Sequence, residues 1–450
     1  MAAMPITDDA IVQDALKPPR RRPLSADVLL TFGNKAGVLL LNVAGTIVVA
    51  RTLGPVGRGA IAVAFSMTLL LVQFGSFGLQ SANPYFVARD RRALGRVISN
   101  SVWISLVLGA GLIAVGVGVK AVFPSALRGL DWLDVIVVLI GAPAALASIL
   151  LQSVLLAEGR MLAYNGVELA TATLTFLGLL IGLAVFSMGV LGAIALMIAL
   201  NMAAAGCYLL LLLRDGPELA PPDRELMVRM LRYGLRVYVT TLLAYAVGRI
   251  NLIFVNSYLG SSAAGQYSIG ISLSDGMHLL PSVVALNLFP RIARGEPHER
   301  SAAVFRSLTL LFALLCLITV PIAGPGIRLV FGQAFAPAVP IYYWLLPGIF
   351  AYGMVNVLSY HFAGRGFPLE AVLIWIPGLI LNVVLVVTLV PSGGTHIAAL
   401  AATVSYALIL FMHMRLFAKE SGGYGSLLPR PRETFQLSLD AWRALRLGAG

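Results

Sequence analysis

Long unbroken apolar segments recur along the whole chain, with short polar stretches between them. A helix needs about 20 apolar residues to cross the hydrocarbon core of a bilayer. The strands of a membrane barrel would instead alternate apolar and polar positions. The pattern therefore predicts an all-α polytopic membrane protein. Its twelve predicted transmembrane helices cover residues 27–50, 60–83, 98–119, 133–155, 164–187, 190–212, 237–258, 265–288, 303–324, 338–359, 369–390 and 396–417.

Composition supports this prediction and excludes other classes. Hydrophobic residues make up 59% of the chain and charged residues only 12%, against about a quarter charged in a soluble domain. The net charge of +12 does not indicate nucleic acid as a partner, because the basic residues are spread over short loops. Cys207 and Cys316 lie inside predicted helices and indicate neither a disulfide framework nor a metal set.

The basic residues predict the orientation. An even number of spans places both termini on one side. The tails and loops of that side carry 25 of the 32 Lys and Arg residues, the other face carries five, and Lys35 and Arg249 lie inside spans. Cytoplasmic loops are enriched in Lys and Arg, so both termini are predicted to be cytoplasmic.

The spans divide the chain into two halves of six. The longest internal loop, between spans six and seven, contains an amphipathic stretch with Leu226, Met227, Met230 and Leu231, which we expect to lie along the inner membrane surface. A second amphipathic stretch around Phe435 and Trp442 is either surface-bound or solvated. The predicted organisation is a cytoplasmic N-terminal tail (1–26), an N-terminal six-helix bundle (27–212), a cytoplasmic linker (213–236), a C-terminal six-helix bundle (237–417) and a cytoplasmic tail (418–450).

An internal repeat relates the two halves. Features of the first half recur in the second at offsets of 205 or 206 residues, each at the equivalent helix end. Because six spans per half is an even number, the halves share one orientation and a pseudo-two-fold axis along the membrane normal. Transporters of this build place the substrate site between the halves. The matched positions are Leu53, Gly54 and Gly59 with Leu259, Gly260 and Gly265, Pro84 with Pro290, and Gly159-Arg160 with Gly364-Arg365.

Several segments resemble bacterial polysaccharide transporters. "ARTLGPVGRGAIAVAFS" and "YLGSSAAGQYSIGISL" are similar to the first-loop motif of the Wzx-like (O-antigen flippase) branch of the multidrug/oligosaccharidyl-lipid/polysaccharide (MOP) exporter superfamily. The stretches "LRYGLRVYVTTLLAYAVGRINLIFVNSYLG", "LVFGQAFAPAVPIYYWLLPG" and "AGRGFPLEAVLIWIPGLILNVVLVVTLV" resemble its seventh span, its ninth-to-tenth loop and its eleventh span. The resemblance covers residues from about 25 to 415, and it rests on the order and spacing of these segments.

The resemblance implies a fold and a function. The fold is MATE-like, with two six-helix bundles around a V-shaped cavity and alternating access. The implied location is the bacterial plasma (inner) membrane, and the implied cargo is an oligosaccharide on undecaprenyl diphosphate. Membrane lipids, a polysaccharide polymerase and glycosyltransferases are the implied partners. The family often has an acidic residue in span seven at the position of Asn251, so a carboxylate role there does not carry over.

Charged residues inside spans are the first candidates for function, because burying them in a membrane is costly. Arg249 in span seven and Lys35 in span one are predicted to bind the diphosphate headgroup. Arg249 could instead pair with Asp275, and Lys35 could extend its ammonium to the surface. Asn42 and Asn251 are predicted to bind sugar hydroxyls, or to join helices by hydrogen bonds.

Three further residues are candidates for coupling transport to H⁺ or Na⁺. Asp275 and His278 lie one turn apart in span eight, and Glu168 lies in span five. The alternatives are that Asp275 neutralises Arg249 and that Glu168 pairs locally. Arg51 and Arg58 flank the first outer turn and are expected to meet water. The sequence contains no recognisable cofactor, metal or nucleophile motif.

Three functions remain open from the sequence. The first is a flippase that moves a lipid-linked oligosaccharide to the outer leaflet, for which two buried cations suit an anionic headgroup. The second is a cation-coupled multidrug antiporter of the same superfamily, which Asp275 and Glu168 would serve. The third is a membrane enzyme of polysaccharide assembly, which would need a large outer loop or a catalytic motif that the sequence lacks.

Overall fold

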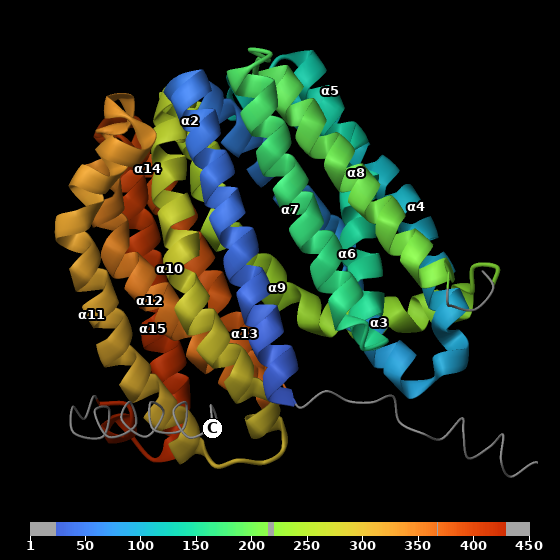
Figure 1. Cartoon of the computed structure of the whole chain (residues 1–450). Coiled ribbons are helices and arrows are strands. Elements are labelled where there is room, and N and C mark those ends of the chain that lie inside the picture. The colour runs from blue at the N-terminus through green and yellow to red at the C-terminus, as the bar shows by residue number, and fades with distance from the viewer. Residues whose placement is uncertain (1–23, 215–219, 367, 429–450) are drawn as a thin grey trace, which may run out of the picture.

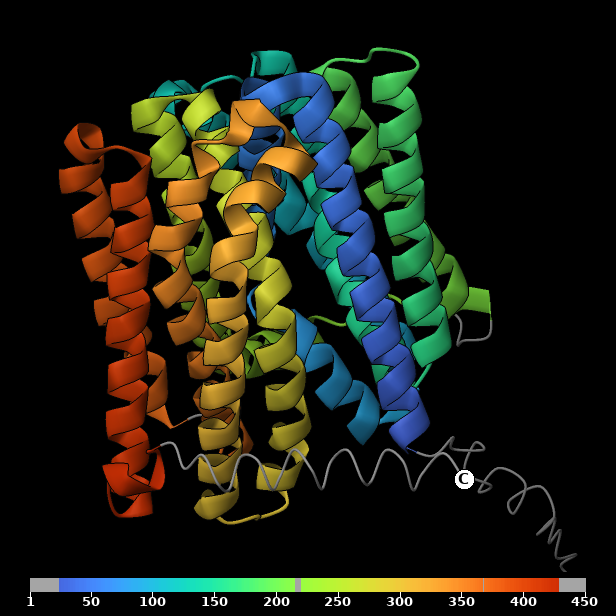
Figure 2. The same cartoon turned by 60° about the vertical axis from the view of Figure 1, so that its left-hand side comes forward.

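The computed structural model describes residues 24–214, 220–366 and 368–428, and these residues form helices, turns and short connections without a β-strand. Two groups of long helices stand side by side (Figures 1 and 2). The N-terminal half comprises α2 (Leu24–Ser76), α3 (Leu79–Arg89), α4 (Leu94–Val122), α5 (Trp132–Ile140), α6 (Ala142–Ala157), α7 (Met161–Ala184) and α8 (Val190–Arg214). The C-terminal half comprises α9 (Arg224–Leu259), α10 (Ser261–Ala293), α11 (His298–Phe331), α12 (Ala338–Gly364), α13 (Leu369–Leu373), α14 (Trp375–Gly393) and α15 (Thr395–Ser421).

The helices supply the predicted twelve spans. In the described residues, eleven helical segments are long and apolar enough to cross a membrane, and the first of them, Gly33–Ser76, has 44 residues. At 1.5 Å per residue a straight helix of that length would be about twice as long as a bilayer core is thick. Helix α2 is broken at Gly54, where φ is 63° and ψ is −171°. Only glycine adopts this backbone without strain. Counted as two crossings, α2 brings the total to twelve, so the predicted all-α fold is confirmed.

Three of the spans consist of two helices each. The second span passes from α2 to α3 through Phe77 and Gly78, both with positive φ. The fourth span changes from α5 to α6 at Gly141, two residues before Pro143, which has no N–H to continue the helical ladder. The eleventh passes from α13 to α14 at Ile374. The hydropathy pattern alone predicted these spans as continuous helices.

The repeat is visible where the two halves meet. We call the end of the molecule that carries Gly54 and Gly260 the outer end, following the predicted orientation; it is at the top of Figure 1. Both glycines have positive φ, 63° and 86°. Just beyond them, Gly59 of α2 and Gly265 of α10 bring the two helix backbones into direct contact. A Cβ on Gly59 would lie 1.8 Å from the carbonyl oxygen of Ser261, and one on Gly265 would lie 1.9 Å from that of Pro55.

This contact is reciprocal, because Ser261 stands in the second half where Pro55 stands in the first. Such an exchange of equivalent contacts is the property of a two-fold interface. The predicted pseudo-two-fold axis is therefore confirmed and passes between the two glycines. The repeat is less regular at the inner end, where Gly159 has a φ of 73° but its sequence partner Gly364 is helical, and Gly366 has the positive φ instead.

The linker between the halves has a different environment from the one predicted. Its amphipathic stretch forms the first turns of α9, which begins after the cap Asp223 and continues without a break into span seven. Leu226 and Met230 are 3% and 0% exposed and pack in the core of the N-terminal half. The apolar face that we expected to lie on the membrane is therefore covered by protein. The stretch around Phe435 and Trp442 lies outside the described residues.

Candidate functional site

A cavity of about 280 Å³ lies between the two halves. Residues of α2, α7 and α8 line it from the N-terminal half, and residues of α9 and α10 line it from the C-terminal half. Most of the lining is apolar, with a few polar side chains placed among aliphatic and aromatic ones, as is usual for a ligand site. The polar and charged lining residues are Asn42, Thr46, Arg58, Ser66, Thr175, Arg249, Ser268, Ser272 and Asp275.

Arg249 and Asp275 form an ion pair in this cavity. Nη2 of Arg249 lies 2.9 Å from Oδ2 of Asp275. The Arg249 side chain is 22% exposed and that of Asp275 is 48% exposed, so the pair is open to the cavity. The neutralising pair considered from the sequence is therefore present. Its position also leaves both groups within reach of a ligand between the halves.

Arg58 is a third charged group of this cavity, contrary to the expectation from its position in the sequence. We expected it to meet water beside the outer turn. Because a new helix starts after Gly54, Arg58 instead lies one turn along that helix and faces inward. Its Nη2 donates a hydrogen bond to Oγ of Ser272 at 3.1 Å, and its Nε is buried without a hydrogen-bond partner among the described residues. The spacing from Arg58 to Ala62 and Ser66, which also line the cavity, was the available signal.

The charges of the cavity are therefore two guanidinium groups, from Arg58 and Arg249, against one carboxylate, from Asp275. Arginine suits phosphate oxygens because its planar group can donate two parallel hydrogen bonds. A site with an excess of cationic donors and a largely apolar wall fits a ligand with an anionic group and an apolar part. It fits a cationic ligand less well.

Lys35 and Glu168 form a second polar cluster nearer the inner end. Nζ of Lys35 lies 2.6 Å from Oε1 of Glu168 and 2.7 Å from the hydroxyl of Tyr164. Asn34 donates to the other carboxylate oxygen at 3.0 Å and to Asn165 at 3.3 Å. Lys35 and Glu168 are 39% and 20% exposed. The sequence offered Lys35 as a phosphate ligand and Glu168 as a coupling acid or a paired carboxylate; in the structure the two residues pair with each other.

Two further cavities adjoin the central one. A second cavity inside the N-terminal half is lined by Glu168 and shares Asn42 with the central one. A third cavity, inside the C-terminal half, is lined by His278 and Asn251 and shares Arg249 and Asp275 with the central one. With the exception of Lys35, the predicted site residues border these three adjoining cavities, and Asn42 is exposed where two of them meet.

Asn251 and His278 both bond within the C-terminal half. Asn251 is 2% exposed, and it exchanges side-chain hydrogen bonds with Asn382 at 3.2 and 2.7 Å. It therefore joins α9 to α14. Nε2 of His278 lies 3.0 Å from the carbonyl oxygen of Ile349 on α12. These contacts correspond to the helix-joining alternative for Asn251, and a role in sugar binding stays a prediction.

Comparison with solved structures finds the same fold in membrane transporters. An inward-facing multidrug-resistance MATE transporter of the MOP superfamily aligns at a TM-score of 0.68 and 17% identity, over 85% of this chain and 94% of that one. The lipid II flippase MurJ, in an inward closed conformation, aligns at 0.67 and 12% identity, over 94% and 92%. A MOP superfamily transporter from Pyrococcus furiosus aligns at 0.61 and 17% identity, over 87% and 95%.

Comparison by sequence gives the family. No curated protein sequence matches the chain. A family model described as "Polysaccharide biosynthesis protein" matches residues 26–296, which is more than half of the chain. The chain therefore belongs to the polysaccharide biosynthesis protein family, and it has the fold of MOP superfamily transporters.

Proposed function

We propose that the protein is an alternating-access flippase that moves a polyprenyl-diphosphate-linked oligosaccharide from the cytoplasmic to the outer leaflet. The observation that carries the proposal is the central cavity, where Arg58 of one half and Arg249 of the other face a common space. Two guanidinium groups can bind the two phosphates of the headgroup. The family of the chain supports the same assignment. So does the fold, which a lipid II flippase shares.

In this proposal the diphosphate competes with Asp275 for Arg249. Asp275 neutralises Arg249 in the empty cavity, where an unpaired guanidinium would be costly to bury. An arriving diphosphate accepts hydrogen bonds from Arg249 and Arg58, and the carboxylate moves away from the anionic headgroup. The polyprenyl chain stays in the lipid, and the sugar occupies the space beside Asn42 and Thr46.

The contact at the outer end gives the cycle its closed gate. Besides the two glycines, Nδ2 of Asn256 donates to the carbonyl oxygens of Ala126 and Arg128 at 3.1 Å each, and Ser257 bonds Ser125 at 3.0 Å. These bonds join α9 to the loop after α4. In the described state these contacts hold the two halves together at the predicted outer end. Breaking these contacts while the inner ends approach would expose the headgroup to the other side.

A flipping assay tests the proposal. Purified protein is reconstituted in liposomes that carry a polyprenyl-diphosphate oligosaccharide on one leaflet, and a sugar-modifying enzyme on the other side reports its arrival. We expect rapid arrival with wild type, loss with Arg249→Ala and Arg58→Ala, and no change with Arg229→Ala. Arg229 is a 56% exposed arginine on the linker and serves as the matched control.

The same assay separates the alternatives. Unchanged flipping by both cavity variants would refute the cationic headgroup site. A folded wild-type protein that moves no lipid-linked sugar, but exports a cationic drug in a manner that Asp275→Asn abolishes, would establish the antiporter instead. Transfer of sugar between acceptors by the purified protein would establish the membrane enzyme.

A further inference from the structure

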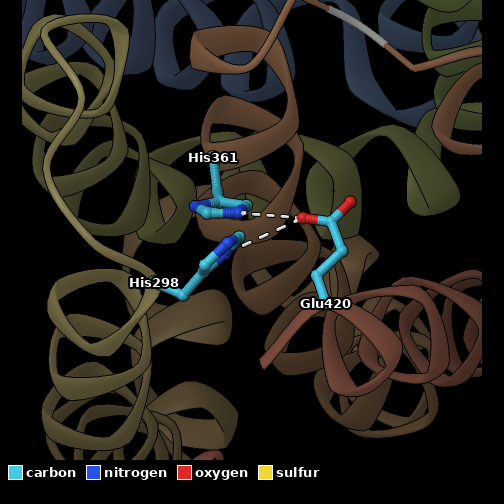
Figure 3. Close-up of side chains that lie close together, drawn as sticks. All are labelled: His298, His361 and Glu420. Carbon is cyan, nitrogen blue, oxygen red and sulfur yellow. Dashed lines mark ion pairs between the residues drawn. The ribbon is translucent and has the colours of Figure 1, made fainter. Parts of the chain in front are cut away.

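A cluster of potential metal ligands lies at the inner end of the C-terminal half, away from the central cavity. His298 begins α11, His361 lies in the last turn of α12 and Glu420 lies near the end of α15 (Figure 3). One ligand atom from each of the three residues lies within 4.8 Å of the others. Both Nδ1 of His298 and Nε2 of His361 point to the same atom, Oε2 of Glu420, at 3.8 Å each (Figure 3).

Among the residues that the structure describes, the two imidazole nitrogens find no hydrogen-bond partner. Nδ1 of His298 and Nε2 of His361 are buried without one among the described residues, and the His361 side chain is 0% exposed. A distance of 3.8 Å is too long for a hydrogen bond. Leaving a buried polar atom unpaired costs about 1–3 kcal/mol. Two such atoms directed at one carboxylate oxygen therefore need an explanation.

Protonation of both imidazole rings does not explain the two unpaired nitrogens. The ring centroids of His298 and His361 are 5.3 Å apart, and Nε of Arg365 lies 4.0 Å from the same carboxylate oxygen. Two imidazolium ions and a guanidinium would then surround one carboxylate, and the three cations would repel each other. The Arg365 contact leaves both ring nitrogens unpaired, and because Arg365 is 44% exposed its guanidinium can turn toward water when a cation occupies the space beside Glu420.

A divalent cation bound between the three atoms would give both ring nitrogens a partner and would explain why they point to one carboxylate oxygen. Nδ1 of His361 lies 2.7 Å from Oγ of Ser301, so when Nδ1 holds the ring proton and donates it, Nε2 presents its lone pair to the cluster. In a tetrahedral zinc site with bonds of about 2.0–2.1 Å, neighbouring ligand atoms are about 3.3 Å apart. Both nitrogens lie 3.8 Å from the carboxylate oxygen and within 4.8 Å of each other, so each ligand would have to move by less than about 1 Å.

We propose that His298, His361 and Glu420 bind a zinc ion, with water as the fourth ligand, and that the ion joins the inner ends of α11, α12 and α15. Two histidines and one carboxylate are a ligand set that zinc prefers, whereas Mg²⁺ and Ca²⁺ prefer oxygen ligands. His298 and Glu420 are 22% and 27% exposed, which gives the ion a path from water. Ser301 holds the His361 ring, and the ion fixes the three helices relative to each other.

The test is direct metal binding by the full-length protein in detergent, with the purification tag removed and the chain stripped by a chelator. Zn²⁺ affinity is measured by competition with a chromophoric chelator, and Co²⁺ is added as a spectroscopic probe. We expect one Zn²⁺ per chain and a visible Co²⁺ d–d spectrum without a thiolate charge-transfer band. The His361→Ala and Glu420→Gln variants should bind Zn²⁺ at least ~100-fold more weakly.

Matched variants keep the result interpretable. His396→Ala and Glu370→Gln remove an exposed histidine and an exposed carboxylate elsewhere, and both should leave the affinity unchanged. Ser301→Ala keeps all three ligands and should weaken binding by about 10–100-fold. Absence of Zn²⁺ binding by folded wild type, a thiolate band, or an affinity that the ligand variants do not lower would overturn the proposal. If the ligand variants fail to fold, the wild-type stoichiometry and the Ser301→Ala variant still decide it.

Discussion

Nη2 of Arg58 donates a hydrogen bond to Oγ of Ser272 across the space between the two halves, over 3.1 Å. Arg58 belongs to α2 and Ser272 to α10. In the proposed cycle this bond must open when the halves separate at the outer end, and its donor is also one of the two cavity cations. Arg58 therefore combines a contact between the halves with a charge that lines the central cavity, and the two features can be tested separately.

Removing the Ser272 hydroxyl and removing the Arg58 charge should change the flipping rate by different amounts. Ser272→Ala deletes the neutral acceptor, which is worth about 0.5–1.5 kcal/mol, and should change the flipping rate by less than about tenfold. Arg58→Ala deletes the charge and should abolish flipping. Arg58→Lys should keep part of it, because lysine holds the charge but not the bidentate geometry. Equal loss in Ser272→Ala and Arg58→Ala would mean that Arg58 acts only through the gate.

A second prediction concerns the glycine contact at the outer end. A methyl group at Gly59 or Gly265 would overlap a backbone carbonyl of the other half, and backbone cannot rotate away as a side chain can. Gly59→Ala should therefore destabilise the closed outer gate while leaving each half folded. Gly118→Ala is the matched control, because a Cβ on that helical glycine meets no atom within 4 Å. The readout is the gate crosslink described next, whose yield should fall with Gly59→Ala and stay constant with Gly118→Ala.

A disulfide should lock the outer gate. The hydroxyl oxygens of Ser125 and Ser257 are 3.0 Å apart and come from opposite halves. In a chain with Cys207→Ser and Cys316→Ala, the pair Ser125→Cys and Ser257→Cys should crosslink under mild oxidation. Flipping should then stop and should return on reduction, whereas each single cysteine variant should be insensitive to oxidant. Full flipping by the crosslinked protein would contradict alternating access through this gate.

The sequence was sufficient for the fold because membrane burial leaves few alternatives. Continuous apolar runs permit only helices, and the paired Leu-Gly motifs at 53–54 and 259–260 mark the same turn in each half. The sequence was insufficient where tertiary contacts decide what covers a side chain. Leu226 and Met230 show the same spacing whether lipid or protein covers them, and only the packed structure reveals that protein does.

The candidate site was predicted only in part, because some of its residues are brought together by tertiary contacts. Arg249 and Asp275 stand out as charges inside apolar runs, and their pairing follows from neighbouring spans. Arg58 follows a glycine turn, so hydropathy assigned it to water although the helix had already turned inward. The histidine and glutamate ligands proposed for zinc come from three helices and are separated by 63 and 59 residues in the chain. No local spacing rule could have connected them.

The linker provides a prediction about pH. Asp223 caps α9 by accepting a hydrogen bond from the Leu226 N–H at 3.0 Å, and it pairs with Arg96 of α4 at 3.0 Å. The backbone bond first, and Arg96 second, lower the pKa of Asp223 below its ordinary value of 3.8. A lowered pKa means that this group stabilises the fold above about pH 4, and that the contribution is lost as pH falls through the lower folded-state value.

Asp223→Asn should therefore lower the thermal stability of the detergent-solubilised protein at pH 7 by a small amount. Asparagine still caps the helix but does not pair with Arg96. The difference from wild type should shrink as pH falls from about 4 through the lower folded-state pKa, below which Asp223 is protonated in both states. Asp90→Asn, which removes an exposed carboxylate from a neighbouring inner loop, is the control. A difference that grows on acidification would contradict the assigned sign.

The last prediction separates the two roles of Lys35. Its Nζ lies 2.6 Å from Glu168, so Lys35→Ala leaves a carboxylate that is only 20% exposed without its cation. Removing one member of such a pair usually destabilises more than removing both. Lys35→Ala should therefore lower the yield of folded protein, and the double variant Lys35→Ala with Glu168→Gln should restore it.

Flipping by the folded double variant then decides the function of the pair. Near wild-type flipping would mean that Lys35 and Glu168 only join α2 to α7, whereas loss of flipping despite restored folding would show that the pair contacts the substrate or the coupling ion at the inner mouth of the cavity.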